Sequence, residues 1–367
     1  MQPHRSSATL LAALYILLVL YASLYPFSEW RDQGLGPFAY LTAPWPNYWS
    51  QFDTFANFAG YAPLGFLATL ALLRTTLLPW PIVWVAIAAS ALSLLMEALQ
   101  TYLPQRVPAL SDWLLNSAGA LAGAWLANTL EKLGAIDHWS RFRRRWFVAD
   151  ARTALVLLLT WPIALLFPPA VPLGLGQVFE RVEATLEAAL AHTPFLVWLP
   201  VRGQDLLPMA PLGEMVCVAL GLLVPCLLGY AHAQGQWRRA IFLIAVCAIA
   251  VMASSLSAAL SYGPDQAWRW ITPPVWYGLW LGAAAATLSM GLPRRACLAL
   301  LLVALVWQLS QVNMVPSTPY FAQTLQSWEQ GRFVRFHGLA QWIGWVWPYA
   351  VLMLALAKLS RRDRVPA

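Results

Sequence analysis

AIFLIAVCAIAVMASSLSAAL, residues 240–260, is a run of 21 residues without a charged side chain. An α-helix rises about 1.5 Å per residue, so this run would extend about 31 Å, close to the roughly 30 Å thickness of the hydrocarbon core of a bilayer. Arg238 and Arg239 precede it and would lie at the membrane surface. The stretch therefore predicts a transmembrane helix.

The same apolar pattern recurs along the whole chain. Of its 367 residues, 60% are hydrophobic and only 11% are charged, whereas soluble domains are about 25% charged. Tryptophan is also frequent, with 21 residues, and indole rings are typical anchors of helix ends at a bilayer interface. Ten stretches are long enough to cross the hydrocarbon core, near residues 8–27, 54–73, 82–103, 109–129, 153–171, 210–230, 239–260, 271–291, 296–314 and 338–358.

We therefore expect an all-α, polytopic helical membrane protein with about ten transmembrane helices. The first stretch ends in Tyr25-Pro26-Phe27, without the small residues of a signal-peptide cleavage site, so we interpret it as a retained helix. The four cysteines lie inside apolar stretches and the five histidines are scattered, so neither residue type indicates a cofactor or metal site. Nucleic-acid binding is not expected of such a chain, despite its net charge of +7.

The distribution of basic residues predicts the orientation in the membrane. With the N-terminus in the cytoplasm, the predicted cytoplasmic segments hold 16 of the 23 Lys and Arg residues. The positive-inside rule favours this assignment, which also places the C-terminus in the cytoplasm. The run Arg143–Arg145 has two interpretations, a topology signal or a binding site for anionic lipid headgroups.

A weak internal similarity predicts the organisation of the chain. The motif YAPLG at 61–65 recurs as MAPLG at 209–213, and residues 93–105 resemble residues 255–266. Both copies point the same way, so we infer a parallel 4+4 helix repeat, with chance similarity between Ala- and Leu-rich segments as the alternative. The expected parts are a four-helix unit at 1–130, a basic cytoplasmic connector at 131–152, a degenerate second four-helix unit at 153–291 with an outer amphipathic helix at 177–191, and two C-terminal helices with a basic tail at 292–367.

Polar residues of the first unit gather at one end of the predicted helices. Glu97 and Gln100 are three residues apart on the third helix, and Asp112 and Asn116 are four apart on the fourth, so each pair shares a helix face. Arg106 lies in the connection between the two helices. Ionisable groups inside a membrane are costly unless they are paired or hydrated, which makes this cluster a candidate functional site.

Small residues and one further amide belong to the same region. Gly119 and Gly123 form a GxxxG face one turn beyond the fourth-helix pair, and Gly65 lies on the second helix. Such glycines let a neighbouring backbone approach closely, so we expect them to pack helices together. Asn57, at the corresponding end of the second helix, adds a sixth polar side chain to the cluster.

At these residues the chain resembles the VanZ-like family of bacterial membrane proteins, named after a member associated with teicoplanin resistance. The resemblance covers about residues 8–130, and Thr54 and Phe55 depart from it, since many members have a basic or His residue there. It implies a multi-pass protein of the bacterial inner (cytoplasmic) membrane with a role in the cell envelope or in antibiotic resistance. The matching residues are Asn57, Pro63, Gly65, Phe66, Ser93, Glu97, Gln100, Arg106, Asp112, Asn116, Gly119 and Gly123.

Four interpretations of the cluster are open at this point. One is a hydrogen-bond network that only fixes helix packing, with Arg106 neutralising Glu97 or Asp112. The leading one is an outer-leaflet pocket for the headgroup of a polyprenyl-linked glycan or other envelope glycolipid, in which Arg106 holds phosphate while Glu97, Gln100, Asp112 and Asn116 bind sugar hydroxyls or a divalent cation.

The other two interpretations belong to different classes of protein. Glu97 and Asp112 would serve a membrane-embedded hydrolase or transferase as an acid–base pair. A parallel repeat is also typical of lipid or small-molecule transporters. In each case the expected partners are membrane lipids and other proteins of envelope assembly.

Overall fold

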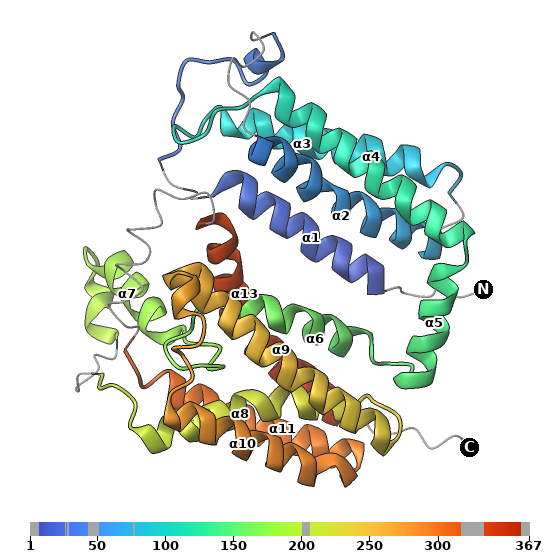
Figure 1. The fold of residues 1–367 in the computed structure, drawn as a ribbon. Helices are drawn as coiled ribbons and strands as arrows, with labels where there is room; N and C mark the ends of the chain where they lie inside the picture. The colour runs from blue at the N-terminus through green and yellow to red at the C-terminus, as the bar shows by residue number, and fades with distance from the viewer. Residues whose placement is uncertain are drawn as a thin grey trace. The chain divides into compact units, whose positions relative to one another are not determined.

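The computed structural model describes residues 7–25, 27, 29–42, 51–75, 78–199, 206–316 and 334–360. These residues form twelve α-helices, α1–α11 and α13, with short 3₁₀ turns between some of them (Figure 1). No β-strand occurs in this described part of the chain, although Phe147 and Ala233 form an isolated bridge. The chain divides into two compact units, Met1–Arg144 and Arg145–Ala367, here called unit 1 and unit 2. Their boundary falls inside the connector expected at 131–152.

Unit 1 is built around a close pair of helices, α2 and α4. Its helices are α1 (Ser7–Leu24), α2 (Gln51–Thr75), α3 (Pro81–Gln100), α4 (Leu110–Lys132) and α5 (Ala135–Trp146), the last of which crosses the unit boundary. At three glycines an added Cβ atom would lie 1.9–2.0 Å from a carbonyl oxygen of the other helix: Gly65 against Ala120, Gly119 against Phe58, and Gly123 against Ala62. The two backbones therefore touch directly, which only glycine permits.

Helices α1 and α3 pack against this pair through two small apolar clusters. The first joins all four helices through Val19, Tyr61, Leu64, Ala89 and Ala120. The second lies where α1 and α3 end, and comprises Leu24, Met96 and Leu103. The polar residues of interest occupy the same end of the unit.

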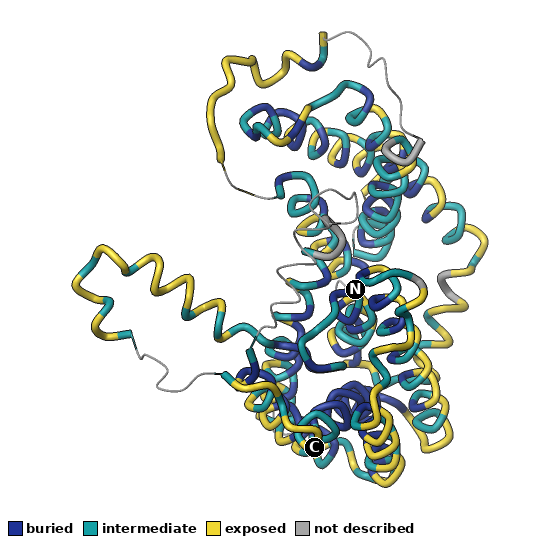
Figure 2. The backbone as a smooth tube through the Cα atoms, turned by 60° about the vertical axis from the view of Figure 1, so that its left-hand side comes forward, coloured by how far each residue is buried: buried dark blue, intermediate teal, exposed yellow. Residues whose placement is uncertain are grey.

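The helices of unit 2 pack around one central helix, α8. Every residue from Cys217 to Ala233 is buried, and α6, α9, α10 and α11 pack around α8 (Figure 2). A helix segment buried on all sides must be apolar all round, as α8 is from Cys217 to Leu228. The helices of the unit are α6 (Arg152–Ala164), α7 (Phe179–Leu190), α8 (Pro211–Tyr230), α9 (Gln236–Tyr262), α10 (Pro273–Leu288), α11 (Arg294–Val312) and α13 (Val334–Ser360).

The helix expected at 153–171 ends earlier than predicted. Helix α6 has only 13 residues and stops at Ala164. Prolines follow at 168, 169 and 172, and proline both lacks an N–H group and disfavours helical geometry in the preceding residue. At about 1.5 Å per residue α6 extends about 20 Å, which is less than the hydrocarbon thickness.

Residues 165–178, here called the proline-rich segment, continue from α6 without helical structure, and residues 173–176 are buried. Buried backbone outside a helix needs other hydrogen-bond partners. Side chains at the end of α11 provide them: Gln308 Nε2 donates to Leu173 O (2.9 Å), Asn313 Nδ2 donates to Gly176 O (3.1 Å), and Asn313 Oδ1 accepts the N–H groups of Val178 and Phe179 (3.0 Å each).

At the other end of α6, Asp150 connects two later helices. Its Oδ2 accepts hydrogen bonds from Arg294 Nη2 in α11 and Lys358 Nζ in α13, both at 2.6 Å. Burial alone would raise the pKa of Asp150, but the two cations outweigh that effect and lower the pKa to about 2. The carboxylate is therefore charged at any physiological pH.

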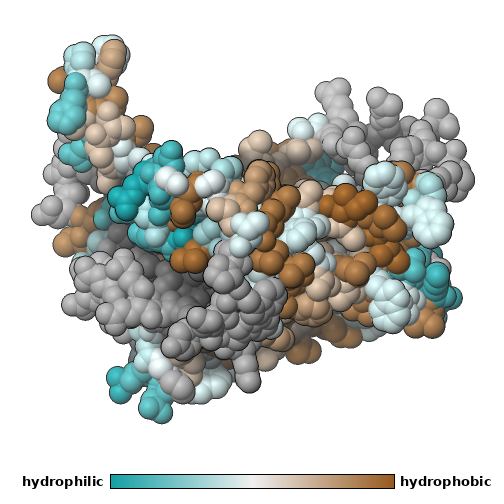
Figure 3. Space-filling model, turned by 90° about the horizontal axis from the view of Figure 1, so that it is seen from above, coloured by the Kyte–Doolittle hydropathy of each residue, from teal (hydrophilic) through white to brown (hydrophobic). Residues whose placement is uncertain are grey.

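The structure is that of a polytopic helical membrane protein. Among the residues that the structure describes, six helices are long and apolar enough to cross a membrane: Thr54–Thr75, Pro81–Gln100, Pro211–Tyr230, Gln236–Tyr262, Arg294–Val312 and Gly338–Ser360. Each of the ten expected stretches overlaps a helix, although α6 covers only the first part of 153–171. Large hydrophobic side chains such as Leu17, Ile87 and Ile244 are exposed on the helices, and Figure 3 shows hydrophobic residues (brown) over the surface. An apolar surface of this kind suits contact with lipid.

The internal repeat stays a prediction. In unit 2 an added Cβ at Gly278 or Gly282 of α10 would lie 2.6 or 2.8 Å from carbonyl oxygens of α8, much as the α4 glycines meet α2. However, Pro63 lies inside α2, whereas Pro211 is the first residue of α8. The two prolines that the sequence pairs therefore occupy different positions in their helices.

Candidate functional site

Glu97 connects the end of α3 to the start of α4. It lies one turn before the end of α3, with 3% of its surface exposed. Its carboxylate Oε2 accepts the N–H of Ala109 at 3.1 Å, and Ala109 is the residue that precedes α4. The first N–H groups of a helix have no partner within the helix, so a carboxylate is a favourable acceptor there.

Arg106 and Gln100 bind the end of α1. Arg106 is 9% exposed, and its guanidinium donates from Nε and Nη2 to Tyr25 O (3.0 and 2.6 Å) and from Nη2 to Ala22 O (3.0 Å). Gln100 Nε2 donates to Ser23 O at 3.0 Å. The last carbonyl groups of a helix have no partner within it, so both side chains supply the donors that the end of α1 needs.

Asn116 joins α4 to α3. It is buried, and its Nδ2 donates to Ser93 Oγ at 3.0 Å. Its Oδ1 is buried and has no hydrogen-bond partner within the described part of the chain. A buried amide oxygen without a donor is costly, so this atom is a candidate contact for a ligand.

Asp112 lies in the first turn of α4, where the helix dipole favours a carboxylate. The hydroxyl of Ser111 donates to its Oδ1 at 3.3 Å. Asp112 and Arg106 are both close enough to Glu97 to act on it electrostatically. Two of the residues singled out from the sequence thus act on a third, the buried carboxylate of Glu97.

Asn57 lies on α2, apart from this centre. The carbonyl of the next residue, Phe58, faces Gly119, which places Asn57 at the level of the α4 turn that contains Asn116. The Asn57 side chain is half-buried and forms no hydrogen bond within the described residues. The amides of Asn57 and Asn116 therefore lie at the same depth in unit 1.

Residues 9–131 match the family model VanZ/LLP1. The N-terminal portion of this chain is VanZ-like. The match contains nearly all of α1 and α4, all of α2 and α3, and all six polar residues described above, whereas α5 and unit 2 lie outside it. Neither the curated proteins nor the solved structures yielded a match to the chain.

The VanZ-like portion contains further polar groups that the sequence did not single out. Ser90 Oγ bonds both Trp113 Nε1 (3.1 Å) and Ser117 Oγ (3.0 Å), and so joins α3 to α4 one turn below the Ser93–Asn116 bond. The buried Tyr61 hydroxyl faces Ser93 without a well-aligned hydrogen bond. The sequence did contain a signal for these groups, because Ser90 and Ser93 are three residues apart on α3 and lie opposite polar residues of α4.

Tyr40 covers the cluster from the loop after α1. It is 3% exposed, and its hydroxyl donates to the Leu94 carbonyl at 3.2 Å. Burial, together with the nearby Glu97 carboxylate, raises the pKa of Tyr40 to about 12. The phenol therefore stays protonated and acts as a donor.

A groove runs along α3 and α4 of the VanZ-like portion, beside this network. It contains about 910 Å³ of space free of protein atoms, including the part open to the surroundings. Its walls are mainly apolar, with Ser90, Trp113 and Ser117 as polar points: Ala86, Ile87, Ser90, Ala91, Leu94, Trp113, Ser117, Ala118 and Leu121. Ser117 adjoins Asn116 in sequence, so the groove and the cluster belong to the same helix pair.

The chemistry available in the VanZ-like portion is that of hydrogen-bond acceptors. Glu97, Asp112 and Asn116 Oδ1 accept, while the donors of Arg106 and Gln100 bond the end of α1. The described residues contain no group of three or more His, Cys, Asp or Glu side chains placed to hold a metal ion. The site is thus suited to ligands that donate hydrogen bonds.

Proposed function

We propose that the VanZ-like portion binds the headgroup of a lipid-linked glycan or another glycolipid of the cell envelope, at the outer leaflet. The VanZ-like match suggests a membrane protein of the envelope or glycopeptide-resistance type. The observation that carries the proposal is the α3–α4 groove beside an acceptor-rich polar cluster. A lipid with a sugar headgroup matches both features.

The headgroup would be recognised by its hydroxyl groups. Asn116 Oδ1 has no donor in the described part of the protein, and Asp112 is half-buried at the start of α4. Sugar hydroxyls donate hydrogen bonds to carboxylate and amide oxygens, and such bonds are strong when the acceptor is charged. In this proposal Arg106 positions the α3–α4 connection through α1, and phosphate recognition at Arg106 is not required.

The hydrocarbon chain of the same lipid would lie in the groove. The groove is open along one side between α3 and α4, and Ile87, Leu94 and Leu121 provide its apolar walls. A polyprenyl or acyl chain in this groove would pass Ser117 and bring the headgroup to the level of the cluster. Specificity would then come from the headgroup, because apolar walls distinguish chains weakly.

Substitution of the two acids tests the headgroup part of the proposal. Glu97→Gln keeps an oxygen that can accept the Ala109 N–H, and Asp112→Asn keeps the shape of the side chain, so both variants should fold. Lipid that co-purifies with the full-length protein from bacterial membranes would be identified by mass spectrometry. We expect both variants to lose bound glycolipid, whereas Asp265→Asn, an exposed change in unit 2, should keep it. If both acid variants retain as much glycolipid as the wild type, the polar cluster does not bind the headgroup and is only a structural hydrogen-bond network.

A second pair of variants tests the groove. Ala91→Trp or Ala118→Trp would fill it without touching the polar cluster. Ala88→Trp is the matched control, because Ala88 is exposed on the same helix and does not line the groove. The first two variants should lose the lipid and the control should retain it. Equal retention in all three would show that the groove does not hold the chain.

A further inference from the structure

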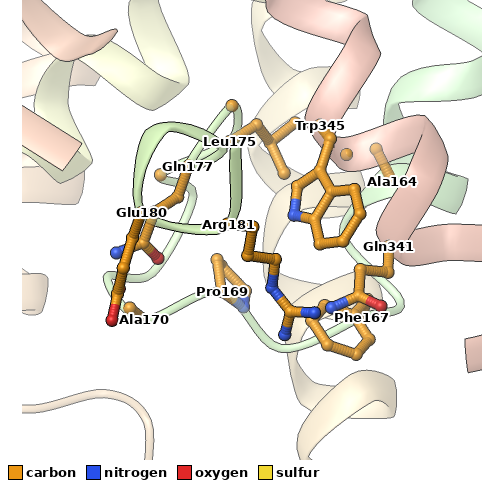
Figure 4. Close-up of a pocket in the computed structure, with 13 residues that line it drawn as sticks. Ala164, Phe167, Pro169, Ala170, Leu175, Gln177, Glu180, Arg181, Gln341 and Trp345 are labelled. Carbon is orange, nitrogen blue, oxygen red and sulfur yellow. The ribbon is translucent and has the colours of Figure 1, made fainter. Parts of the chain in front are cut away.

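A second pocket lies in unit 2, outside the VanZ-like portion. The proline-rich segment, the start of α7 and α13 form its walls (Figure 4). It contains about 500 Å³ of space free of protein atoms, including an open side. Its lining is mainly apolar, from residues such as Phe167, Pro169 and Leu175, and its charged groups are Glu180 and Arg181.

Arg181 is held in this pocket by an aromatic ring. Its guanidinium carbon lies 4.9 Å from the centre of the Trp345 ring, and Figure 4 shows the guanidinium between Trp345, Gln341 and Phe167. The Glu180 side chain points to the opposite side of the pocket in the same view. Arg181 forms no ion pair within the described residues, and its charge is stabilised by the Trp345 ring and by the nearby Glu180 carboxylate.

The helix that leads to the pocket, α6, is short. Helix α6 begins at Arg152 and extends only about 20 Å before the proline-rich segment starts. A helix of this length that starts at the cytoplasmic surface ends before the far side of a hydrocarbon core about 30 Å thick. Irregular backbone is tolerated at that depth where protein buries it or where it lines a site. Arg181 is exposed on α7 while its guanidinium faces the pocket, so an anionic headgroup can reach it.

We propose that this pocket binds the phosphate group of an anionic membrane phospholipid, with Arg181 as its ligand. The guanidinium would donate to the phosphate oxygens, while the ring of Trp345 fixes its plane through the cation–π contact. The acyl chains would remain in the lipid phase and contact the apolar lining. With the N-terminus in the cytoplasm, as the basic residues predict, this lipid belongs to the outer leaflet.

The test uses the purified full-length protein in detergent, titrated with phosphatidylglycerol and followed by native mass spectrometry. We expect Arg181→Gln to bind phosphatidylglycerol at least about tenfold more weakly, because the variant loses one charge-assisted hydrogen bond. Arg181→Lys keeps the charge but loses the planar stacking, so its loss should be intermediate. The control is Arg269→Gln, which removes an exposed arginine of unit 2 away from the pocket and should bind as the wild type does.

Four results would overturn the proposal. Wild-type affinity in Arg181→Gln, or an equal loss in Arg269→Gln, would show that the pocket does not recognise the lipid. Equally tight binding of phosphatidylcholine at Arg181 would show that net negative charge is not required. Displacement of the lipid by millimolar inorganic phosphate would assign the pocket to free phosphate. Resistance to inorganic phosphate, with loss only in the Arg181 variants, supports the phospholipid.

Discussion

Gly119→Ala should separate the two central helices of the VanZ-like portion. The new Cβ atom would lie 2.0 Å from the Phe58 carbonyl oxygen, and an ordinary contact begins near 3.4 Å. The helices would therefore have to move apart by about 1.4 Å. Both colliding groups are fixed to helix backbones, so no change of rotamer can relieve the contact.

The energies of this change can be compared with a matched control. Overpacking of this severity costs about 3 kcal/mol, and the better helix propensity of alanine returns about 1 kcal/mol, so Gly119→Ala should lose about 2 kcal/mol. Gly60→Ala lies on α2, and an added Cβ there meets no atom within 4 Å. That variant should gain about 1 kcal/mol from helix propensity alone.

The assay is reversible unfolding of the purified protein in mixed micelles with increasing sodium dodecyl sulfate. The two variants should differ by about 3 kcal/mol, with wild type between them. Gly123→Ala, which meets Ala62 O at 1.9 Å, should behave as Gly119→Ala does. If Gly119→Ala proves as stable as Gly60→Ala, α2 and α4 do not touch through their backbones, and the reasoning on this helix pair is wrong.

Three further predictions concern other parts of the chain. Arg106→Gln should destabilise unit 1 by about 2 kcal/mol, because the half-buried carbonyls of Ala22 and Tyr25 lose a charged donor; the same unfolding assay would measure it, and an unchanged free energy of unfolding would contradict it. Asp150→Asn should lower the free energy of unfolding by on the order of 1 kcal/mol at pH 7, after allowance for solvent screening. The folded-state pKa of Asp150, about 2, is below the ordinary value of 3.8. The wild-type advantage in stability is therefore complete above that ordinary value and should vanish as the pH falls from about 4 to 2. Reporter fusions at residues 138, 235 and 293 should report the cytoplasm and those at 40 and 190 the outside; an inverted signal at 190 would reject the predicted orientation of unit 2.

The positions of the helices followed from the sequence because they depend on local properties. A stretch such as 240–260 carries its length and apolarity in its own residues, and helix α9 (Gln236–Tyr262) includes it. The early end of α6 also had a local signal, the prolines at 168 and 169, but the expected span disregarded them because the apolar run continued to residue 171.

The roles of individual polar residues were harder to predict, because their partners are distant in the sequence. The sequence paired Arg106 with Glu97 or Asp112. Arg106 does act on Glu97 electrostatically, but it also donates hydrogen bonds to carbonyl groups 81 and 84 residues earlier, which the sequence did not predict. A backbone carbonyl has no signature in the sequence. The groove on α3 and α4 and the Arg181 pocket were also missed, since both depend on how helices pack.

The proline-rich segment has a consequence for the order in which the protein is made. The N–H group of Val178 is bonded by Asn313, which is 135 residues further along the chain. During synthesis at the membrane this stretch therefore leaves the ribosome long before its partner exists, and its polar backbone groups must be hydrated or shielded in the meantime. Unit 2 can close only after α11 has been inserted, so a nascent chain cut short before Asn313 should be a substrate for membrane proteolysis.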